Sequence, residues 1–329
     1  MGMLAAAEAL AREAHADQRR KGPGDVPYFS HLDSVAGRLR GAGVTDEATL
    51  AAAYLHDLLE DRPAFETRLR AEMPPEVVET VEVLTEKKRD AQGKSRSKGE
   101  RFADYLRGLQ REGPAVLRAL SISCADKIDN VQSLLEAQRR GVQLLLELRT
   151  RPGQHAGQLA ALRRVYAAHV PAPLLRDLDA AAAELTGFIE AWLPGRAAAI
   201  AAAAHLGQFD KSGAPYILHP MRLMVRASTR EEQMVAALHD VVEDSAWTFE
   251  QLIDEGFPPS VVSALDRLTR RAGESYEDFI ERVAEDPLAR RVKLLDLEDN
   301  MDAKRLAQIT PQDLQRLERY HRARSRLLG

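Results

Sequence analysis

Residues 55–61 read Leu-His-Asp-Leu-Leu-Glu-Asp, and residues 238–244 repeat this stretch as Leu-His-Asp-Val-Val-Glu-Asp. Each stretch ends an Ala-rich apolar run without Gly or Pro, which predicts a helix. On a helix, His56 and Glu60 share one face because they are four residues apart. Four ionisable groups with apolar neighbours are costly to bury unpaired, and a bound cation is the simplest partner for them. The sequence therefore predicts helices that carry a metal site in each half of the chain.

The two halves also share the sequence that precedes these stretches. Residues 14–31 contain a His, then a Lys, then Pro-Tyr-x-x-His, and residues 204–219 contain the same series in the same order. Each half later ends an apolar run with an Asp that is followed, four residues on, by an Asn. Six of the nine histidines fall at paired positions. This pattern indicates an internal repeat, so we predict two domains of one type.

Composition narrows the class of protein and its partners. The chain has 329 residues, of which 45% are apolar and 29% charged, as in a globular protein of about two domains. A net charge of -4 gives no general attraction to nucleic acid or to anionic membranes. The single cysteine, Cys124, excludes an intrachain disulfide and a multi-thiolate metal site. Without a signal-peptide pattern or a run of roughly 18 apolar residues, we expect a cytoplasmic protein with no membrane or nucleic-acid partner.

Helix-forming residues dominate the whole chain. Aromatic residues make up only 5%, and Gly and Pro fall between the predicted helices. We therefore predict an all-α fold with domains at residues 1–170 and 196–329, joined by an Ala- and Leu-rich helical connector at 171–195. Fusion of two copies predicts an internal pseudo-dimer, which replaces the contact of one domain with a twin and is compatible with a monomeric chain.

Each half supplies two histidines and two aspartates at corresponding positions. These groups are His31, His56, Asp57 and Asp126 in the first half, and His219, His239, Asp240 and Asp296 in the second. This donor set suits manganese, iron or a similar octahedral ion better than structural zinc. Such an ion lowers the pKa of bound water and polarises a phosphoryl oxygen. The candidates to orient or deprotonate that water are Glu60, Asp61, Glu243 and Asp244. The alternative is a buried ion-pair network that only fixes the packing of the helices.

The order His…His-Asp…Glu-Asp…Asp, preceded by Lys…Pro-Tyr-x-x-His, resembles that of the HD-domain phosphohydrolases. In particular, it is similar to the hydrolase domain of the Rel/Spo-type alarmone enzymes and their small stand-alone relatives. The resemblance implies an all-α domain that binds one manganese ion and removes pyrophosphate from the 3′ position of guanosine tetra- and pentaphosphate. It implies metal and catalytic roles for the residues named above. The residues that it implies contact the nucleotide are Arg20, Lys21, Asn130, Lys211 and Asn300.

Three departures leave the substrate of each half open. Asp210 stands where the first half has Arg20, which removes a cation from the second half. Leu297 replaces the basic residue that follows the metal aspartate, and Ser123 replaces the lysine that precedes it. Two alternatives therefore accompany the alarmone hypothesis. The substrate is another nucleotide or a phosphorylated cofactor such as NADPH, or one half is a non-catalytic domain that senses a nucleotide or has a structural role.

The basic segment and the remaining histidines are interpreted separately. The basic segment at residues 87–98 is either a solvated loop or a flap over a bound polyphosphate. His15 and His205 are interpreted as buried histidines that pack between helices. The remaining histidines are expected at the surface: His155, His169 and His321.

Overall fold

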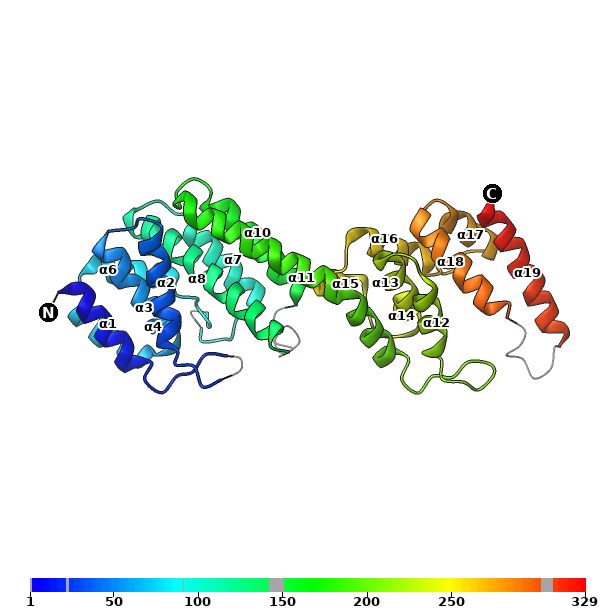
Figure 1. Ribbon diagram of the computed structural model, residues 1–329, viewed down its shortest axis with the longest axis horizontal. Coiled ribbons are helices and arrows are strands. Elements are labelled where there is room, and N and C mark those ends of the chain that lie inside the picture. Colours follow the sequence, from blue (N-terminus) through cyan, green and yellow to red (C-terminus); the bar gives the residue numbers. More distant parts are fainter. Residues whose placement is uncertain (1, 22–23, 91, 142–150, 303–309) are drawn as a thin grey trace. The chain divides into compact units, whose positions relative to one another are not determined.

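The computed structural model describes residues 2–21, 24–90, 92–141, 151–302 and 310–329. Within these ranges the chain forms helices joined by turns, with three isolated β-bridges and no strand (Figure 1). The predicted all-α class is therefore confirmed. In the same ranges, no helix combines the length and the apolar character needed to span a membrane.

The chain folds into two compact units. The first consists of residues 1–150 and 155–186, and the second of residues 151–154 and 187–329. Helices α10 (Pro152–Tyr166) and α11 (Ala172–Ala204) each carry residues of both units. The segment 171–195 lies almost wholly within α11, so it is helical as expected. The predicted domain limits and the internal pseudo-dimer stay predictions.

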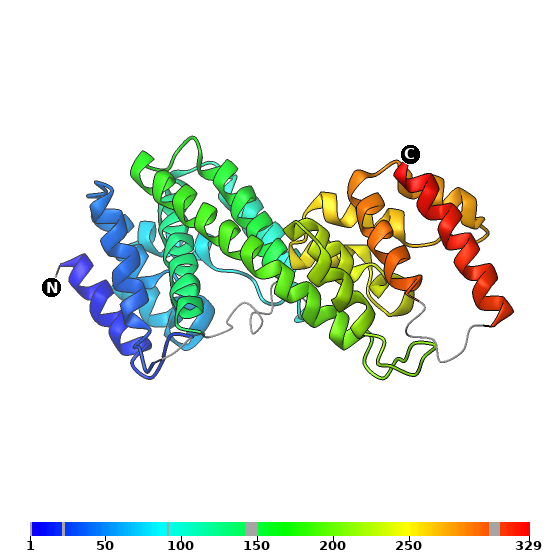
Figure 2. The ribbon, with the colours of Figure 1, turned by 45° about the vertical axis from the view of Figure 1, so that its right-hand side comes forward.

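The first unit is built around a helix that is buried after its first residue. Its elements are α1 (Met3–Ala14), α2 (Phe29–Gly41), α3 (Glu47–Leu55), α4 (Leu58–Asp61), the short 3₁₀ helix η1 (Pro63–Phe65), α5 (Glu66–Glu72), α6 (Pro75–Leu84), α7 (Lys98–Leu109) and α8 (Pro114–Arg139). Every residue of α3 from Ala48 to Leu55 is buried. This helix contacts α1, α2, α6 and α8 (Figure 1, Figure 2). Because α3 is apolar on all sides, it forms the centre of the core and not an amphipathic surface helix.

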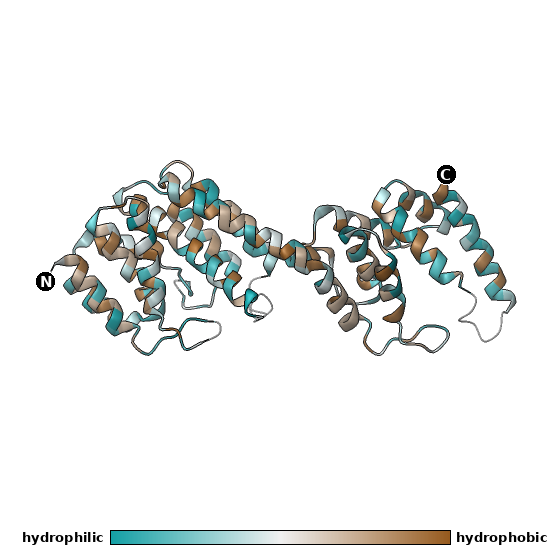
Figure 3. Ribbon diagram, in the orientation of Figure 1, coloured by the Kyte–Doolittle hydropathy of each residue, from teal (hydrophilic) through white to brown (hydrophobic). Residues whose placement is uncertain are grey.

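The second unit repeats this order of helices. Its elements are α12 (Leu218–Arg226), α13 (Arg230–Leu238), α14 (Val241–Asp244), α15 (Phe249–Glu255), α16 (Pro259–Leu268), α17 (Tyr276–Ala284), α18 (Pro287–Asn300) and α19 (Pro311–Leu328). Helix α13 takes the place of α3 and contacts α12, α16 and α18. Most helices of both units carry hydrophilic as well as hydrophobic residues (Figure 3). Their apolar faces can therefore pack around the two central helices.

The stretch at residues 55–61 is not one helix. Helix α3 ends just before His56, and α4 begins just after Asp57. Asp57 has φ -96° and ψ -1°, outside ideal helical values, so the two residues form a turn. The expectation of one continuous helix across residues 55–61 is therefore wrong. The turn brings the side chains of two adjacent residues together, because Asp57 Oδ2 lies 3.1 Å from His56 Nε2.

Both central helices begin with a side-chain cap. The carboxylate of Asp46 accepts hydrogen bonds from the backbone N–H and the hydroxyl of Thr49, at 3.1 and 2.6 Å. The hydroxyl of Thr229 accepts one from the backbone N–H of Glu232 at 3.1 Å. Such caps satisfy amide groups that have no partner within the helix. The caps fix the first residue of each helix. The helices end at Leu55 and Leu238, directly before His56 and His239.

We expect Asp46→Ala to lower the free energy of unfolding by about 1 kcal/mol, because the first amides of α3 lose their acceptor. Urea unfolding followed by circular dichroism measures this change. Asp46→Asn, which keeps a capping oxygen, is the control and is expected to cost less. Equal losses for the two variants would contradict a capping role.

Candidate metal centre and pocket

Four side chains of the first unit converge at the end of the buried helix. The Nε2 atoms of His31, on α2, and His56 lie 3.3 Å apart. Asp57 Oδ2 lies 3.1 Å from Nε2 of His56 and 3.6 Å from that of His31. Asp126 Oδ1, from α8, lies 3.3 Å from Nε2 of His31 and 3.7 Å from that of His56. The structure thus brings together the four residues that the sequence names for the first half.

The outer nitrogens of both histidines are already occupied. His56 Nδ1 lies 2.8 Å from the carbonyl oxygen of Ala53, so this nitrogen must donate. His31 Nδ1 lies 2.8 Å from Asp129 Oδ2 and donates to that carboxylate. Each Nε2 therefore turns toward the other and toward two carboxylates. Nitrogen and oxygen lone pairs at these distances require a proton or a cation between them, so the donor set fits a metal ion.

The second unit contains a matching cluster. His219 Nε2 lies 3.2 Å from Asp296 Oδ1, and His239 Nε2 lies 2.9 Å from Asp240 Oδ2 and 4.0 Å from Asp296 Oδ1. His219 Nδ1 lies 2.7 Å from Asp299 Oδ2. His239 Nδ1 lies 2.9 Å from the carbonyl oxygen three residues earlier. In the part of the chain that the structure describes, two groups of histidine and acidic side chains have ligand atoms close enough together to hold a metal. They are His31, His56 and Asp126 in the first unit, and His219, His239 and Asp240 in the second.

Sequence reasoning missed the carboxylates that orient His31 and His219. Asp129 and Asp299 are both buried, at 4% and 6% exposure, and each accepts the Nδ1–H of the histidine on the neighbouring helix. The signal was present, because Asp-x-x-Asp-Asn occurs at residues 126–130 and again at 296–300. Carboxylates in this position fix the tautomer and raise the basicity of a histidine ligand.

A phenol also contacts each cluster. The hydroxyl of Tyr28 donates to Asp57 Oδ2, and that of Tyr216 donates to Asp240 Oδ2. The ring of His15 stacks on Tyr28 with 5.1 Å between centroids, and His15 is 2% exposed. His205 is equally buried against Tyr216. The interpretation of both histidines as buried packing residues is confirmed.

Burial and neighbouring charges shift the pKa values of the cluster residues in opposite directions. Burial raises the pKa of Asp126, but the ammonium of Lys127 and the two histidines outweigh it and hold this pKa well below its usual range. Burial lowers the pKa of His56, but Asp57 and Asp126 outweigh it and hold the pKa well above the usual value. The cluster therefore attracts positive charge, in the form of protons or of a metal ion.

The acidic pair after the first cluster is held by polar contacts. Lys88 Nζ lies 3.3 Å from Glu60 Oε1 and 3.9 Å from Asp61 Oδ1. Gln18 donates to Asp61 Oδ2 at 2.8 Å. Burial raises the pKa of Glu60. The basic segment at residues 87–98 thus reaches the candidate catalytic residues through Lys88.

The acidic pair of the second unit has different partners. Glu243 Oε2 accepts the backbone N–H of Arg270 at 3.2 Å. Burial, followed by the charges of Asp240 and Glu243, raises the pKa of Asp244. The short connection that follows α16 therefore supplies a backbone amide where the first unit supplies a lysine.

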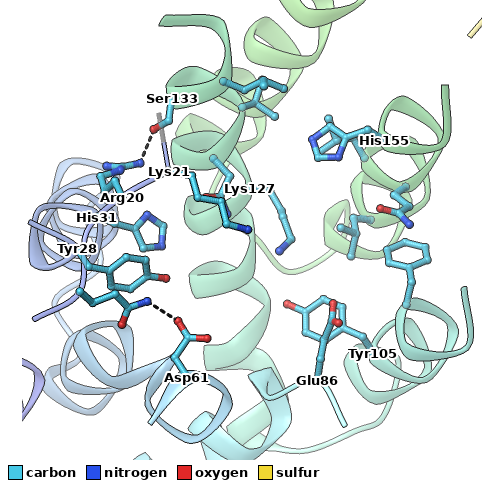
Figure 4. A pocket seen from close by; sticks show the side chains of 18 of the residues that line it. Arg20, Lys21, Tyr28, His31, Asp61, Glu86, Tyr105, Lys127, Ser133 and His155 are labelled. Atoms are coloured by element: carbon cyan, nitrogen blue, oxygen red, sulfur yellow. Dashed lines mark hydrogen bonds between the residues drawn. The ribbon is translucent and has the colours of Figure 1, made fainter. Parts of the chain in front are cut away.

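A cavity of about 500 Å³ lies beside the first cluster. Its lining includes Gln18, Arg20, Lys21, Tyr28, His31, Asp61, Phe102, Tyr105, Lys127, Asn130, His155 and Leu159. In Figure 4, His155 and Lys127 point into this space from different helices. His155 was expected at the surface, but it lines the cavity, and burial together with Lys127 and Lys98 lowers its pKa to about 4. Sequence offered no signal for this role, because the second half has no corresponding histidine.

The predicted nucleotide-binding residues fall into two groups. Arg20 Nη2 lies 2.6 Å from Asp129 Oδ2, and Asn130 donates to Asp126 Oδ1 at 2.6 Å, so both support the first cluster and also line the cavity. Asn300 likewise donates to Asp296 Oδ1, at 2.5 Å. The lysines of the corresponding loops, Lys21 and Lys211, are exposed. Their ammonium groups are therefore accessible to a ligand.

The all-helical fold and the buried cluster define the first unit as a helical domain with a candidate metal centre. Residues 7–150 match the family model described as HD domain. The likeness of the second unit to the first rests on its helix order and on its cluster.

Relatives match about a third of the chain. It is 37% identical over 123 residues to the guanosine-3′,5′-bis(diphosphate) 3′-pyrophosphohydrolase MESH1 of Drosophila melanogaster, a match that covers 36% of this chain and 63% of the fly protein. It is 39% identical over 117 residues to the guanosine-3′,5′-bis(diphosphate) 3′-pyrophosphohydrolase of Haemophilus influenzae, covering 31% of this chain and 17% of that protein. The match therefore spans less than two thirds of either relative.

A solved structure gives a further comparison. It is described as a metazoan ortholog of SpoT that hydrolyzes ppGpp, and it aligns with a TM-score of 0.44 at 26% identity. The alignment covers 55% of this chain and 94% of that one.

We expect Asp129→Ala to weaken metal binding at the first cluster by about 10- to 100-fold, because His31 loses the carboxylate that orients it. Titration of the protein with Mn²⁺ by calorimetry measures this effect. Asp33→Ala is the control, since Asp33 lies on α2 two residues after His31 but accepts a hydrogen bond from Tyr54 and not from a cluster histidine. Equal losses in both variants would rule out a specific role for Asp129.

Metal binding at the second cluster is expected to strengthen as the pH rises. Burial lowers the pKa of His219, but hydrogen bonds to Asp296 and Asp299 outweigh it and raise the pKa to about 9. Below that pH the metal must displace a proton, so the affinity should rise by up to about tenfold per pH unit between about pH 7 and pH 9 and then level off. Mn²⁺ titrations of His56→Ala protein measure this dependence, and an affinity independent of pH would contradict it.

Proposed function

We propose that the first unit is a metal-dependent phosphohydrolase that removes pyrophosphate from the 3′ position of guanosine tetra- and pentaphosphate. The observation that carries the proposal is the cavity of about 500 Å³, which is bordered by both His31 of the cluster and Asp61 of the acidic pair. Its volume falls within the range of small-molecule sites. The pyrophosphohydrolases named above are 37% and 39% identical to about a third of the chain.

We further propose Mn²⁺ as the metal, because mixed imidazole and carboxylate ligands with open positions suit this ion. The proposed ligands are His31, His56, Asp57 and Asp126 in the first unit, and His219, His239, Asp240 and Asp296 in the second. When bound, such an ion lowers the pKa of water and polarises a phosphoryl oxygen.

The protein's own residues would position the substrate and accept the proton. Water oxygen forms a bond to the phosphorus attached at the ribose 3′ oxygen, and the bond between that phosphorus and the 3′ oxygen breaks. The released 3′ oxygen takes up a proton, so the products are pyrophosphate and guanosine 5′-diphosphate or triphosphate. Glu60 is the proposed proton acceptor, because burial raises its pKa and so its affinity for a proton. Lys21 and Lys88 supply positive charge for the phosphates.

For the second unit we propose the same metal-binding role. The corresponding acidic pair is Glu243 and Asp244, and the candidate nucleotide contacts are Lys211 and Asn300. Its substrate is either the same alarmone or another nucleotide, because Asp210 stands in place of Arg20. The alternative of a nucleotide-sensing unit predicts metal binding without turnover. We propose that the reaction takes place in the cytoplasm.

The first experiment is incubation with Mn²⁺ and guanosine 3′,5′-bis(diphosphate), followed by separation of the products on an anion exchanger. Guanosine diphosphate and pyrophosphate are expected. His56→Ala and His239→Ala, made separately, assign the turnover to one unit or to both. Bound Mn²⁺ without turnover would exclude the alarmone as substrate, and absence of bound Mn²⁺ would exclude the metal mechanism.

Glu60→Gln in a His239→Ala background is expected to lower kcat by about 10²- to 10⁴-fold while Mn²⁺ affinity changes little, because the amide cannot accept a proton. Steady-state kinetics and a metal titration of one sample measure both quantities. Glu66→Gln is the control, since Glu66 is exposed on α5 and pairs with Arg70. A normal kcat in Glu60→Gln would remove this residue from the mechanism.

A further inference from the structure

In both clusters an ammonium group binds the same oxygen of the helix aspartate, although it comes from a different sequence position. Lys127, one residue after Asp126, places Nζ 2.8 Å from Asp126 Oδ2. Lys293, three residues before Asp296, places Nζ 2.7 Å from Asp296 Oδ2. In each unit the other oxygen, Oδ1, faces a histidine Nε2, at 3.3 and 3.2 Å. The surroundings of the two carboxylates are therefore alike.

Helix geometry explains why the two positions are interchangeable. The positions three before and one after the aspartate are four residues apart, so they lie on one face of the helix, one turn apart. A long, flexible side chain from either position can reach the same carboxylate. The position without lysine is filled differently in each unit. Ser123 lies between the hydroxyls of Tyr105 and Tyr166, at 2.5 and 2.6 Å, and Leu297 is fully buried.

Each of the two ammonium groups also lies beside an aromatic ring, and the two rings occupy corresponding positions in the two units. Lys127 Nζ lies 5.6 Å from the centre of the Tyr105 ring on α7, and Lys293 Nζ lies 5.1 Å from that of Phe279 on α17. Contact of a cation with the face of an aromatic ring is favourable when the cation is shielded from water. Each unit thus has a prepared position for one ammonium group between the aspartate and an aromatic ring.

The arginine that pairs with the histidine-orienting aspartate also comes from a different sequence position in each unit. In the first unit Arg20 Nη2 lies 2.6 Å from Asp129 Oδ2. In the second unit Arg222, from α12, binds Asp299 through both oxygens, at 2.7 and 2.8 Å. The arginine at 222 replaces a serine, since Ser34 is the residue three after His31 and donates to Asp129 Oδ1 at 2.5 Å. Asp210 therefore does not leave the second cluster without a guanidinium.

We propose that Lys127 and Lys293 are equivalent positioning residues that set the charge of their clusters. The second cluster is then a metal site of the same charge as the first, despite Leu297. In each unit one ammonium offsets one of the two carboxylates and holds its Oδ2. The other oxygen, Oδ1, accepts from Asn130 or Asn300 and keeps a second lone pair for the metal. This inference rests on the proposed function only in treating both clusters as metal sites.

The test is calorimetric titration with Mn²⁺ of Lys293→Met in a His56→Ala background and of Lys127→Met in a His239→Ala background. Removal of the ammonium leaves each cluster more negative by one charge, so both variants are expected to bind Mn²⁺ at least about tenfold more tightly. A lysine that serves only packing would have the opposite effect, because its removal loosens the site. Weaker or unchanged binding in Lys293→Met would overturn the proposal.

Two controls separate the possible causes. Arg226→Met removes a cation beside α18 whose partner is the half-exposed Glu298. Its effect on Mn²⁺ affinity is expected to be within about twofold, because solvent screens this pair. If Lys293→Met does not fold by circular dichroism, Lys293→Gln keeps a donor for Asp296 without the charge and gives the same readout. Absence of Mn²⁺ binding to the His56→Ala parent would instead contradict the proposed metal site of the second unit.

Discussion

The structure depends on holding four electron-pair donors together in a space with little water. In the first unit two imidazole Nε2 atoms lie 3.3 Å apart, and two carboxylates approach them to within 3.1 and 3.3 Å. Such a group is stable only when positive charge compensates it. The surrounding polar contacts serve this requirement, since Asp129 orients one histidine and a backbone carbonyl orients the other.

The helices around the cluster are arranged to deliver these groups from different parts of the chain. The buried helix α3 stops just before His56, and the turn that follows presents two adjacent side chains to one point. A continuous helix would direct adjacent side chains about 100° apart. Helices α2 and α8 pack on each other and supply the remaining two ligand candidates. The same helix contacts therefore form the core and bring the cluster side chains together.

The two units share some cluster residues at corresponding sequence positions and supply others from different positions. The histidines, the aspartates and the asparagine keep their sequence positions, because their geometry is set by the helix that carries them. The cations do not, because a lysine or an arginine reaches several ångströms from its Cα and can approach a carboxylate from more than one position. The substitutions at 210 and 297 look like losses in an alignment of the halves, but both clusters keep their positive partners.

The sequence by itself determined the helical class, the repeat and the eight side chains of the two clusters. These features are visible because helix formers, breakers and the spacing of His and Asp are local properties. Tertiary structure alone decided the break between α3 and α4, the place of His155 in the cavity and the partners of the basic residues. The roles of Asp129 and Asp299 lie between these cases, since their repeated motif is in the sequence and their function appears only with the histidine they face. The physical reason is that contacts between helices depend on packing of side chains far apart in the chain, which local patterns do not encode.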